Sequence, residues 1–301
     1  MEKSLRFAFY MVLLTSSCCS WFDRTLVVFA SSKYAARKTA NDGYACLQAD
    51  RPIDIVLSLY EEDLEVVRSK LERLQKHPFV ANRACVHVYA KSGKTLSLID
   101  AARLNETVVV KTQNRGRESG AYLQYILSNY LNLPRHSIFL QADIEEIDKV
   151  LETLNQATEE TGFLGLGIWG ACNCDNCNLI HGKLVRIREI WALATGKFCL
   201  ETFQANFRGQ MLVSKNRIQR HRSKLYLMLL QSFFAPSKHP IHEDSKYLDS
   251  KLVREMLRNV TENEGGHDSL FGHVMERMWS VIFDCYGEEA HKGCKDADLS
   301  W

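Results

Sequence analysis

The segment NRGRESG, residues 114–120, contains residue types that bind anions. Asn114 and Gly116 allow the backbone to turn closely where a strand passes into a helix. A helix N-terminus attracts phosphate, and the fork of Arg117 can hold a diphosphate or a carboxylate through two hydrogen bonds. The alternative is a structural pair, in which Arg117 and Glu118 fix the turn. We favour a ligand at this segment.

The hydrophobic patterns around this segment predict alternating strands and helices. Continuous apolar, β-branched runs predict buried strands, and apolar residues at helical spacing predict helices between them. The expected strands are residues 53–60, 83–90, 107–113, 136–143 and 163–170, and the expected helices are residues 61–77, 118–131, 144–158, 178–196 and 267–285, with a short strand and a helix capped near Ser214 in residues 209–234. This order indicates an α/β fold with a mostly parallel central sheet and helices on both faces.

Polar residues gather where the expected strands end. They occupy residues 60–63, 113–118 and 141–143. In parallel sheets, ligands bind beyond the carboxyl ends of the strands. One rim of the sheet is therefore the expected binding site.

Length and charge limit the classes of function. The chain has 301 residues, enough for one large domain or two small ones with a substantial core. Its net charge is only +2, so global electrostatics give no reason to expect nucleic acid or an anionic membrane as a partner.

The N-terminus has the pattern of a secretory signal. Lys3 and Arg6 precede an apolar stretch over residues 7–22, which is short for a membrane-spanning helix. We expect a cleaved signal peptide; a retained short anchor and a buried N-terminal helix are the alternatives. Asn105 and Asn259 lie in glycosylation triplets. The expected location is the secretory pathway, either secreted or in the ER or Golgi lumen, with membrane contact only through an uncleaved anchor.

The cysteines agree with an oxidising compartment. The chain has ten, of which Cys18 and Cys19 lie in the leader. Cys285 and Cys294 flank a short polar loop and are the expected local disulfide. Cys85 lies in an expected strand, where it is either a disulfide partner or a buried free thiol.

The string CNCDNCNLIH has two interpretations. Cys172, Cys174, Cys177 and His181 could form a zinc site with three thiolates and one imidazole. The spacing is not that of a standard zinc knuckle, and a secretory location favours disulfides. We expect disulfides.

Four motifs resemble those of known families. LSLYEEDLEVV, NRGRESGAYL and HVMERMWSVIF resemble segments of glycosyltransferases with the A-type fold, and IFLQAD lies where those enzymes carry an Asp-x-Asp metal motif. Over residues 53–283 the set most closely resembles a large uncharacterised family known mainly from fungi, with Tyr-Asn-Glu-Asp, Asn-x-Gly-Arg-Glu, Phe-Leu-Gln-Gly-Asp and Glu-Arg-x-Trp motifs. The resemblance implies a fold like that of nucleotide-diphospho-sugar transferases.

The resemblance implies a metal role for Asp143. A cation at a strand-end carboxylate would neutralise a leaving nucleoside diphosphate, and oxygen ligands suit Mg²⁺ or Mn²⁺. Gln141 replaces the first acid of the usual pair, so Asp143 would bind the metal largely with phosphate and water, or no metal would be used. The alternative is a helix N-cap, because Glu146 follows three residues later.

The resemblance also implies roles for other residues. Tyr60 and Glu62 could hold the nucleobase or ribose, although Glu62 could instead be a first-turn helix acid. Glu118 could hold sugar hydroxyls. Glu276 is a candidate catalytic base, with an amphipathic-helix acid paired to Arg277 as the alternative, and Asp268 is a competing base.

Together these inferences define one expected protein. Residues 1–22 are a signal or anchor, 23–51 a linker, 52–286 a single glycosyltransferase-like α/β domain, and 287–301 a C-terminal tail. The expected partners are a nucleotide sugar and a hydroxyl acceptor. The rival hypothesis is a secreted, non-catalytic module on the same fold that binds glycan or protein.

Overall fold

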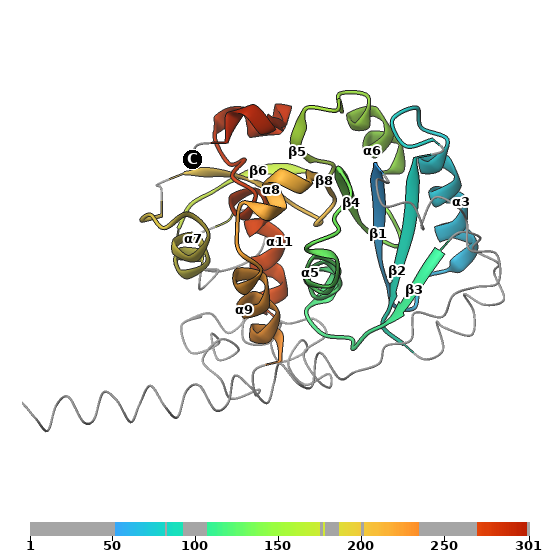
Figure 1. Ribbon diagram of the computed structural model, residues 1–301, viewed down its shortest axis with the longest axis horizontal. Helices are drawn as coiled ribbons and strands as arrows, with labels where there is room; N and C mark the ends of the chain where they lie inside the picture. The colour runs from blue at the N-terminus through green and yellow to red at the C-terminus, as the bar shows by residue number, and fades with distance from the viewer. Residues whose placement is uncertain are drawn as a thin grey trace, which may run out of the picture. The chain divides into compact units, whose positions relative to one another are not determined.

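The computed structural model describes residues 52–81, 83–92, 107–174, 177, 187–199, 202–234 and 270–299 (Figure 1). The expected leader, Asn105, Asn259 and Asp268 lie outside these residues. Within the described part of the chain, no helix has both the length and the apolar character needed to cross a bilayer.

The main sheet has a parallel half and an antiparallel half. Its strand order is β3-β2-β1-β4-β8-β5-β9. The bounds are β1 (Ile53–Leu59), β2 (Ala84–Ala90), β3 (Thr107–Lys111), β4 (His136–Gln141), β5 (Thr161–Gly165), β8 (Met211–Ser214) and β9 (Cys294–Lys295). The first four strands in this order are parallel, whereas β8 pairs antiparallel with both β4 and β5, and β9 pairs antiparallel with β5. The predicted α/β fold with parallel central strands is confirmed.

Helices cover both faces of the sheet (Figure 1). The helices α3 (Leu64–Gln75) and α6 (Ile147–Leu154) lie on one face, and α5 (Arg117–Asn129), α7 (Ile187–Thr195), α9 (Ser223–Phe233) and α11 (Leu270–Ile282) belong to the other side. Successive side chains of β1 pack into hydrophobic clusters on opposite faces of the sheet. Ile55 and Leu57 belong to the cluster on the α3 face, and Val56 belongs to the cluster on the α5 face. This alternation explains why the strands read as continuous apolar runs.

Two expected elements are each divided. Residues 163–170 were expected as one strand, but β5 ends at Gly165 and β6 (Trp169–Cys172) pairs with β7 (Phe203–Asn206) in a second sheet. Between β5 and β6, the backbone at Gly167 lies close to the backbone at Phe207. A Cβ on Gly167 would lie 1.9 Å from the Phe207 carbonyl oxygen, so the position has no space for a side chain. Ser214 caps α8 (Lys215–Gln219) as expected, accepting from the Arg217 amide at 3.1 Å, but α9 is a separate helix.

The cysteines are cross-linked. The expected Cys285–Cys294 disulfide is present, and Cys174 pairs with Cys199. Cys172 pairs with Cys177. The zinc interpretation of this segment is therefore wrong, because its three cysteines form disulfides. Cys85 is also disulfide-bonded rather than a free thiol.

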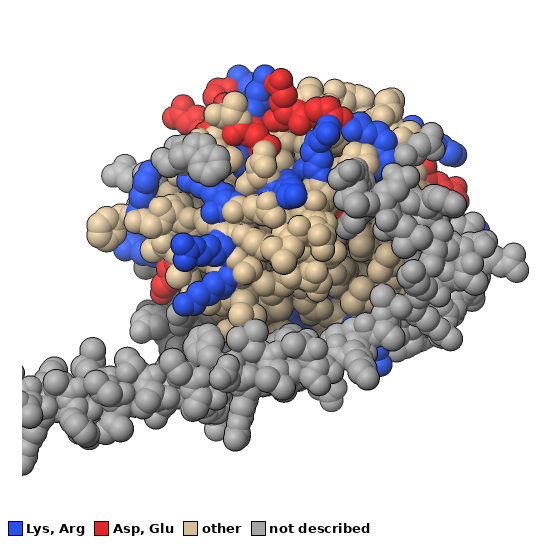
Figure 2. All heavy atoms as spheres, viewed as in Figure 1, with Lys and Arg blue, Asp and Glu red and all other residues tan. Residues whose placement is uncertain are grey.

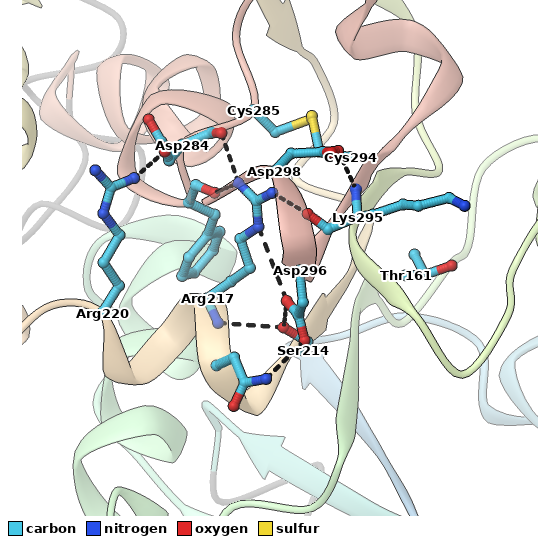
Figure 3. Close-up of polar contacts among 12 residues, drawn as sticks. Thr161, Ser214, Arg217, Arg220, Asp284, Cys285, Cys294, Lys295, Asp296 and Asp298 are labelled. Carbon is cyan, nitrogen blue, oxygen red and sulfur yellow. Dashed lines mark hydrogen bonds and ion pairs between the residues drawn. A yellow bond between two sulfur atoms is a disulfide. The ribbon is translucent and has the colours of Figure 1, made fainter. Parts of the chain in front are cut away.

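A buried arginine fastens the C-terminal segment to the domain (Figure 3). Arg217 is fully buried, and its guanidinium donates to the carbonyl oxygens of Phe283 at 2.9 Å, Asp284 at 2.6 Å and Lys295. Phe283 and Asp284 directly follow α11, so this contact holds the end of that helix. Residues 294–295, expected in a tail, instead form the edge strand β9.

Charges of both signs share one edge of the surface. On the face drawn in Figure 2, acidic side chains gather along the upper edge together with Lys and Arg, while the middle of this face is mostly uncharged. Opposite charges at close range screen one another, so this edge has no field of a single sign.

Candidate functional site

A pocket of about 410 Å³ lies at the carboxyl ends of the parallel strands. Its lining residues come from β1 and β4, from the segments that follow β1, β2, β3 and β4, and from the start of α5. They are Ser58, Tyr60, Glu62, Lys91, Asn114, Arg117, Glu118, Gln141, Asp143 and Glu145. The structure thus gathers six of the nine site residues expected from sequence around one opening: Tyr60, Glu62, Asn114, Arg117, Glu118 and Asp143.

The strand-to-helix turn depends on Gly116. This residue has a φ of 71° and directly precedes α5, and Arg117 follows with a φ of 51°. A Cβ on Gly116 would lie 2.6 Å from the Phe233 ring, so a side chain has no space here. Gly116 does not itself line the pocket. Its contribution is to turn the chain so that Arg117 and Glu118 reach the opening.

Arg117 contacts residues of α11, α5 and the segment after β2. Its Nη1 atom lies 2.8 Å from Nδ1 of His273 on α11, and its Nε atom lies 3.5 Å from Oε2 of Glu118. The Lys91 ammonium donates to the Arg117 carbonyl oxygen. The Arg117–Glu118 pair considered as a structural alternative is therefore present, and both side chains still line the pocket.

Glu118 is a buried carboxyl with one unpaired oxygen. The residue is 5% exposed, and its Oε1 atom has no hydrogen-bond partner among the described residues. Burial raises the pKa of this carboxyl, the Arg117 guanidinium opposes that rise, and the nearby Glu276 carboxylate adds to it. Burial thus makes the ionised form of this carboxyl less favourable than it is in water.

Lys91 is a pocket residue that the sequence interpretation missed. Burial lowers its pKa to about 8, although the carboxylates of Glu118 and Glu62 favour the charged form. Lys91 is the first residue after β2. The strand-end rule that selected the other rim residues would have selected it too.

Asp143 is not a helix cap. Helix α6 begins at Ile147 with Glu146 at its N-cap, so the capping interpretation of Asp143 is wrong. Lys70 donates to the Asp143 backbone carbonyl. Its carboxylate makes no hydrogen bond or ion pair with any described residue. It therefore remains available to a ligand in the pocket.

Glu62 also lies outside its neighbouring helix. The N-cap of α3 is Asp63 and the first-turn acid is Glu65, so the first-turn interpretation of Glu62 is wrong. Oε2 of Glu62 instead accepts from the Tyr60 amide at 2.6 Å. This bond holds the Glu62 carboxylate over the end of β1, at the pocket.

Glu276 is a buried acid on α11. It is 7% exposed, its Oε1 atom accepts from the Arg208 amide at 2.7 Å, and its Oε2 atom lies 3.8 Å from Nη1 of Arg277. It is not among the described lining residues. The structure therefore shows the paired acid that was the alternative to a catalytic base, although this acid is buried rather than on a solvated face.

One group of potential metal ligands lies in the core. Within the described ranges, Asp54, Cys85 and His87 are the three residues whose ligand atoms all lie within 4.8 Å of one another. Because Cys85 is disulfide-bonded, its sulfur is not a thiolate. Among the described residues, no group of this kind includes Asp143.

The comparisons with known proteins give an uncharacterised family and distant structural likenesses. Residues 55–161 match the model of a family described as "Protein of unknown function (DUF3431)". This span contains all the pocket-lining residues. The resemblance to an uncharacterised family is confirmed over these residues. No curated protein matches the chain.

Two solved structures are similar to parts of the chain. One is the mannosyltransferase PcManGT from Pyrobaculum calidifontis in complex with GDP-Man and Mn²⁺, at 15% identity and a TM-score of 0.29, covering 50% of this chain and 45% of that one. The other is 4-diphosphocytidyl-2C-methyl-D-erythritol synthase, at 14% identity and a TM-score of 0.31, covering 60% of this chain and 86% of that one. The chain thus spans less than half the length of the mannosyltransferase.

Proposed function

We propose that this protein is glycosyltransferase-like: it binds a nucleoside-diphosphate sugar in the rim pocket and transfers the sugar to a hydroxyl acceptor. The observation that carries the proposal is the free carboxylate of Asp143, in the same pocket as the cations of Lys91 and Arg117. Such a set can hold a diphosphate through direct charge contacts and through a bridging cation.

The charge balance of the pocket supports a divalent cation. Its lining has two cations, Lys91 and Arg117, and four acids, Glu62, Glu118, Asp143 and Glu145, which leaves two more acids than cations. A diphosphate alone would add to this excess. Mn²⁺ or Mg²⁺ at Asp143 would offset it, and such an ion supplies Lewis-acid stabilisation of the leaving diphosphate.

The other residues have distinct roles in this proposal. Tyr60 and Glu62 hold the nucleobase or ribose, and Asn114 and Arg117 contact the diphosphate. Glu118 faces the sugar. The base that takes the acceptor proton is Glu276 or Asp268; Glu276 does not line the pocket, so it would act from outside the lining.

One observation favours the rival function. Gln141 lines the pocket where an Asp-x-Asp motif would place its first acid. A secreted, non-catalytic module that binds glycan or protein would not need that acid. Saturable affinity for a nucleotide separates the two functions, because the module has no reason to bind one.

The proposed location is the secretory pathway, as a secreted or lumenal protein. The disulfides of the described residues support it, because such bonds persist in oxidising compartments. The apolar N-terminus and the triplets at Asn105 and Asn259 support it from sequence.

The test is ligand-dependent thermal stability. The full chain, produced through a secretory host, is melted against nucleoside diphosphates and nucleotide sugars with and without Mn²⁺. A ligand at about 100 times its dissociation constant should add about 2.7 kcal/mol. Asp143→Ala should abolish the Mn²⁺-dependent part, whereas Glu152→Ala, an exposed acid on α6, should retain it. No shift with any nucleotide would favour the binding module.

A further inference from the structure

Arg208, on the loop between β7 and β8, pairs with two acids of the segment that follows β4. Its Nε atom lies 2.8 Å from Oε2 of Glu145, and its Nη1 atom lies 3.1 Å from Oε2 of Glu146. Glu145 lines the pocket, whereas Arg208 is not among the described lining residues. The guanidinium therefore contacts one acid of the pocket from outside the lining.

Three further contacts fix the position of this loop. The Arg208 amide donates to Oε1 of the buried Glu276 at 2.7 Å, and Nε2 of Gln210 donates to the Glu145 carbonyl oxygen at 3.3 Å. A Cβ on Gly209 would lie 3.1 Å from the side chain of Glu118, so the loop also packs against a second lining residue. The backbone on both sides of Arg208 thus keeps its guanidinium next to Glu145.

The backbone conformation of Arg208 is unfavourable for an arginine. Its φ of 72° lies in the left-handed region, which a residue with a Cβ adopts only at a cost in free energy. The ion pair with Glu145 contributes little to stability, because the two side chains are 25% and 44% exposed. The stability of the fold therefore gives no reason for an arginine here, and its charge beside the pocket does.

Arg208 changes the charge that the pocket presents to a ligand. The lining has two cations and four acids, and Arg208 adds a third cation beside Glu145, so the excess of acids decreases from two to one. Glu146 has a second cation of its own, because Nζ of Lys149 lies 3.1 Å from it. A smaller excess of acids attracts a free divalent cation less strongly and repels a diphosphate less strongly.

We propose that Arg208 is a positioning residue that holds Glu145 and offsets its charge, so that the pocket binds a divalent cation together with a nucleoside diphosphate rather than alone. This inference rests on the proposed function. With Glu145 paired to Arg208, Asp143 is the lining acid of this segment whose carboxylate has no partner among the described residues. A cation held by few carboxylates takes phosphate oxygens as further ligands.

Opposite changes in two affinities test the inference. The full chain is titrated with MnCl₂ alone, followed by the electron paramagnetic resonance of the free ion, and with UDP or GDP at saturating Mn²⁺, followed by calorimetry. Arg208→Gln should bind Mn²⁺ alone about four- to tenfold more tightly and the nucleotide about two- to threefold more weakly. The first effect is larger because the free ion carries a larger charge than its complex with the diphosphate. Loss of structure would weaken both.

A substitution of the partner acid should give the reverse result. Glu145→Gln removes the acid and retains the Arg208 charge, so Mn²⁺ alone should bind more weakly and the nucleotide more tightly. Arg208→Lys keeps the charge, so both affinities should stay within about twofold of wild type. All three effects should decrease from low salt to about 0.5 M NaCl, because salt screens partly exposed charges.

Arg73→Gln is the matched control. Arg73 also pairs with an acid of α6, Asp148, and neither residue is among those that line the pocket. Both affinities should therefore remain those of wild type. Changes of the same sign in Arg208→Gln and in Glu145→Gln, or no change in either, would overturn the inference and leave the proposed function standing. A wild-type chain that binds neither nucleotide would overturn both.

Discussion

The Nε atom of Arg117 lies 3.5 Å from Oε2 of Glu118, yet Oε1 of the same carboxyl has no partner among the described residues. The guanidinium lowers the pKa of this group, and burial raises it by more. The attraction of the Arg117 guanidinium therefore does not offset the loss of hydration that the Glu118 carboxylate undergoes when the protein folds.

Replacing Glu118 with Gln should make stability less dependent on pH. Because the folded-state pKa lies above the usual value of 4.5, the native state binds more protons than the unfolded state once the pH exceeds that value. The native carboxyl therefore destabilises the fold increasingly as pH rises from the unfolded toward the folded pKa. Melting temperatures of Glu118→Gln, relative to wild type, should increase from pH 4 to pH 8.

The control for this prediction is Glu152→Gln on the exposed side of α6. Its melting temperature should follow that of wild type at every pH. A Glu118→Gln difference that stays constant with pH would contradict a raised pKa.

Lys91 should titrate more than two pH units below a typical lysine. Burial lowers its pKa to about 8. Since only the neutral amine reacts with acetic anhydride, mass-spectrometric labelling of Lys91 should give a midpoint near pH 8. A nucleoside diphosphate with Mn²⁺ should slow the labelling of Lys91 alone. A midpoint near 10 for Lys91, the ordinary value for a lysine, would show that this side chain is solvated.

Gly116→Ala should lower the free energy of unfolding more than Gly196→Ala does. Both glycines have a left-handed φ, 71° and 67°, so each variant bears about 1–2 kcal/mol of backbone strain. Gly196 has nothing within 4 Å of an added Cβ, whereas at Gly116 the Phe233 ring would lie 2.6 Å away. Urea unfolding should show an additional cost of about 1–3 kcal/mol for Gly116→Ala. Equal costs would mean that the ring moves aside freely.

Arg217→Met should destabilise the C-terminal segment. The change removes a fully buried guanidinium and leaves the carbonyl oxygens of Phe283, Asp284 and Lys295 without this donor, which should cost about 3–5 kcal/mol. Lys224→Met, at an exposed position on α9, should change the free energy of unfolding by less than about 0.5 kcal/mol. A similar small change in Arg217→Met would show that water replaces the guanidinium.

Most of the elements follow from the sequence because their signal is local. The apolar run of residues 53–59 and the helical spacing of Val67, Leu71 and Leu74 arise from how consecutive residues face a core. The rim position of Tyr60, Asn114 and Asp143 follows in turn, because parallel strands end at one edge of a sheet.

Other features depend on contacts between distant segments. Residues 163–170 form one apolar run in the sequence. In the structure, β5 pairs with β8 and β6 pairs with β7, so the run is divided between two sheets. The same holds for the direction of β8, which the sequence pattern of a buried strand does not reveal.

The sequence by itself determined which residue types stand at the rim, since strand ends and their polar residues are adjacent along the chain. Tertiary structure alone decided their chemical state. Glu118 is a first-turn helix acid by sequence, and it becomes a buried carboxyl with an unpaired oxygen because Gly209, about ninety residues away along the chain, lies against it. Asp143 keeps an unpaired carboxylate because α6 begins four residues later, at Ile147. The burial of a side chain and its hydrogen-bond partners depend on residues that are close in space but distant in sequence. The sequence pattern around the residue therefore does not predict them.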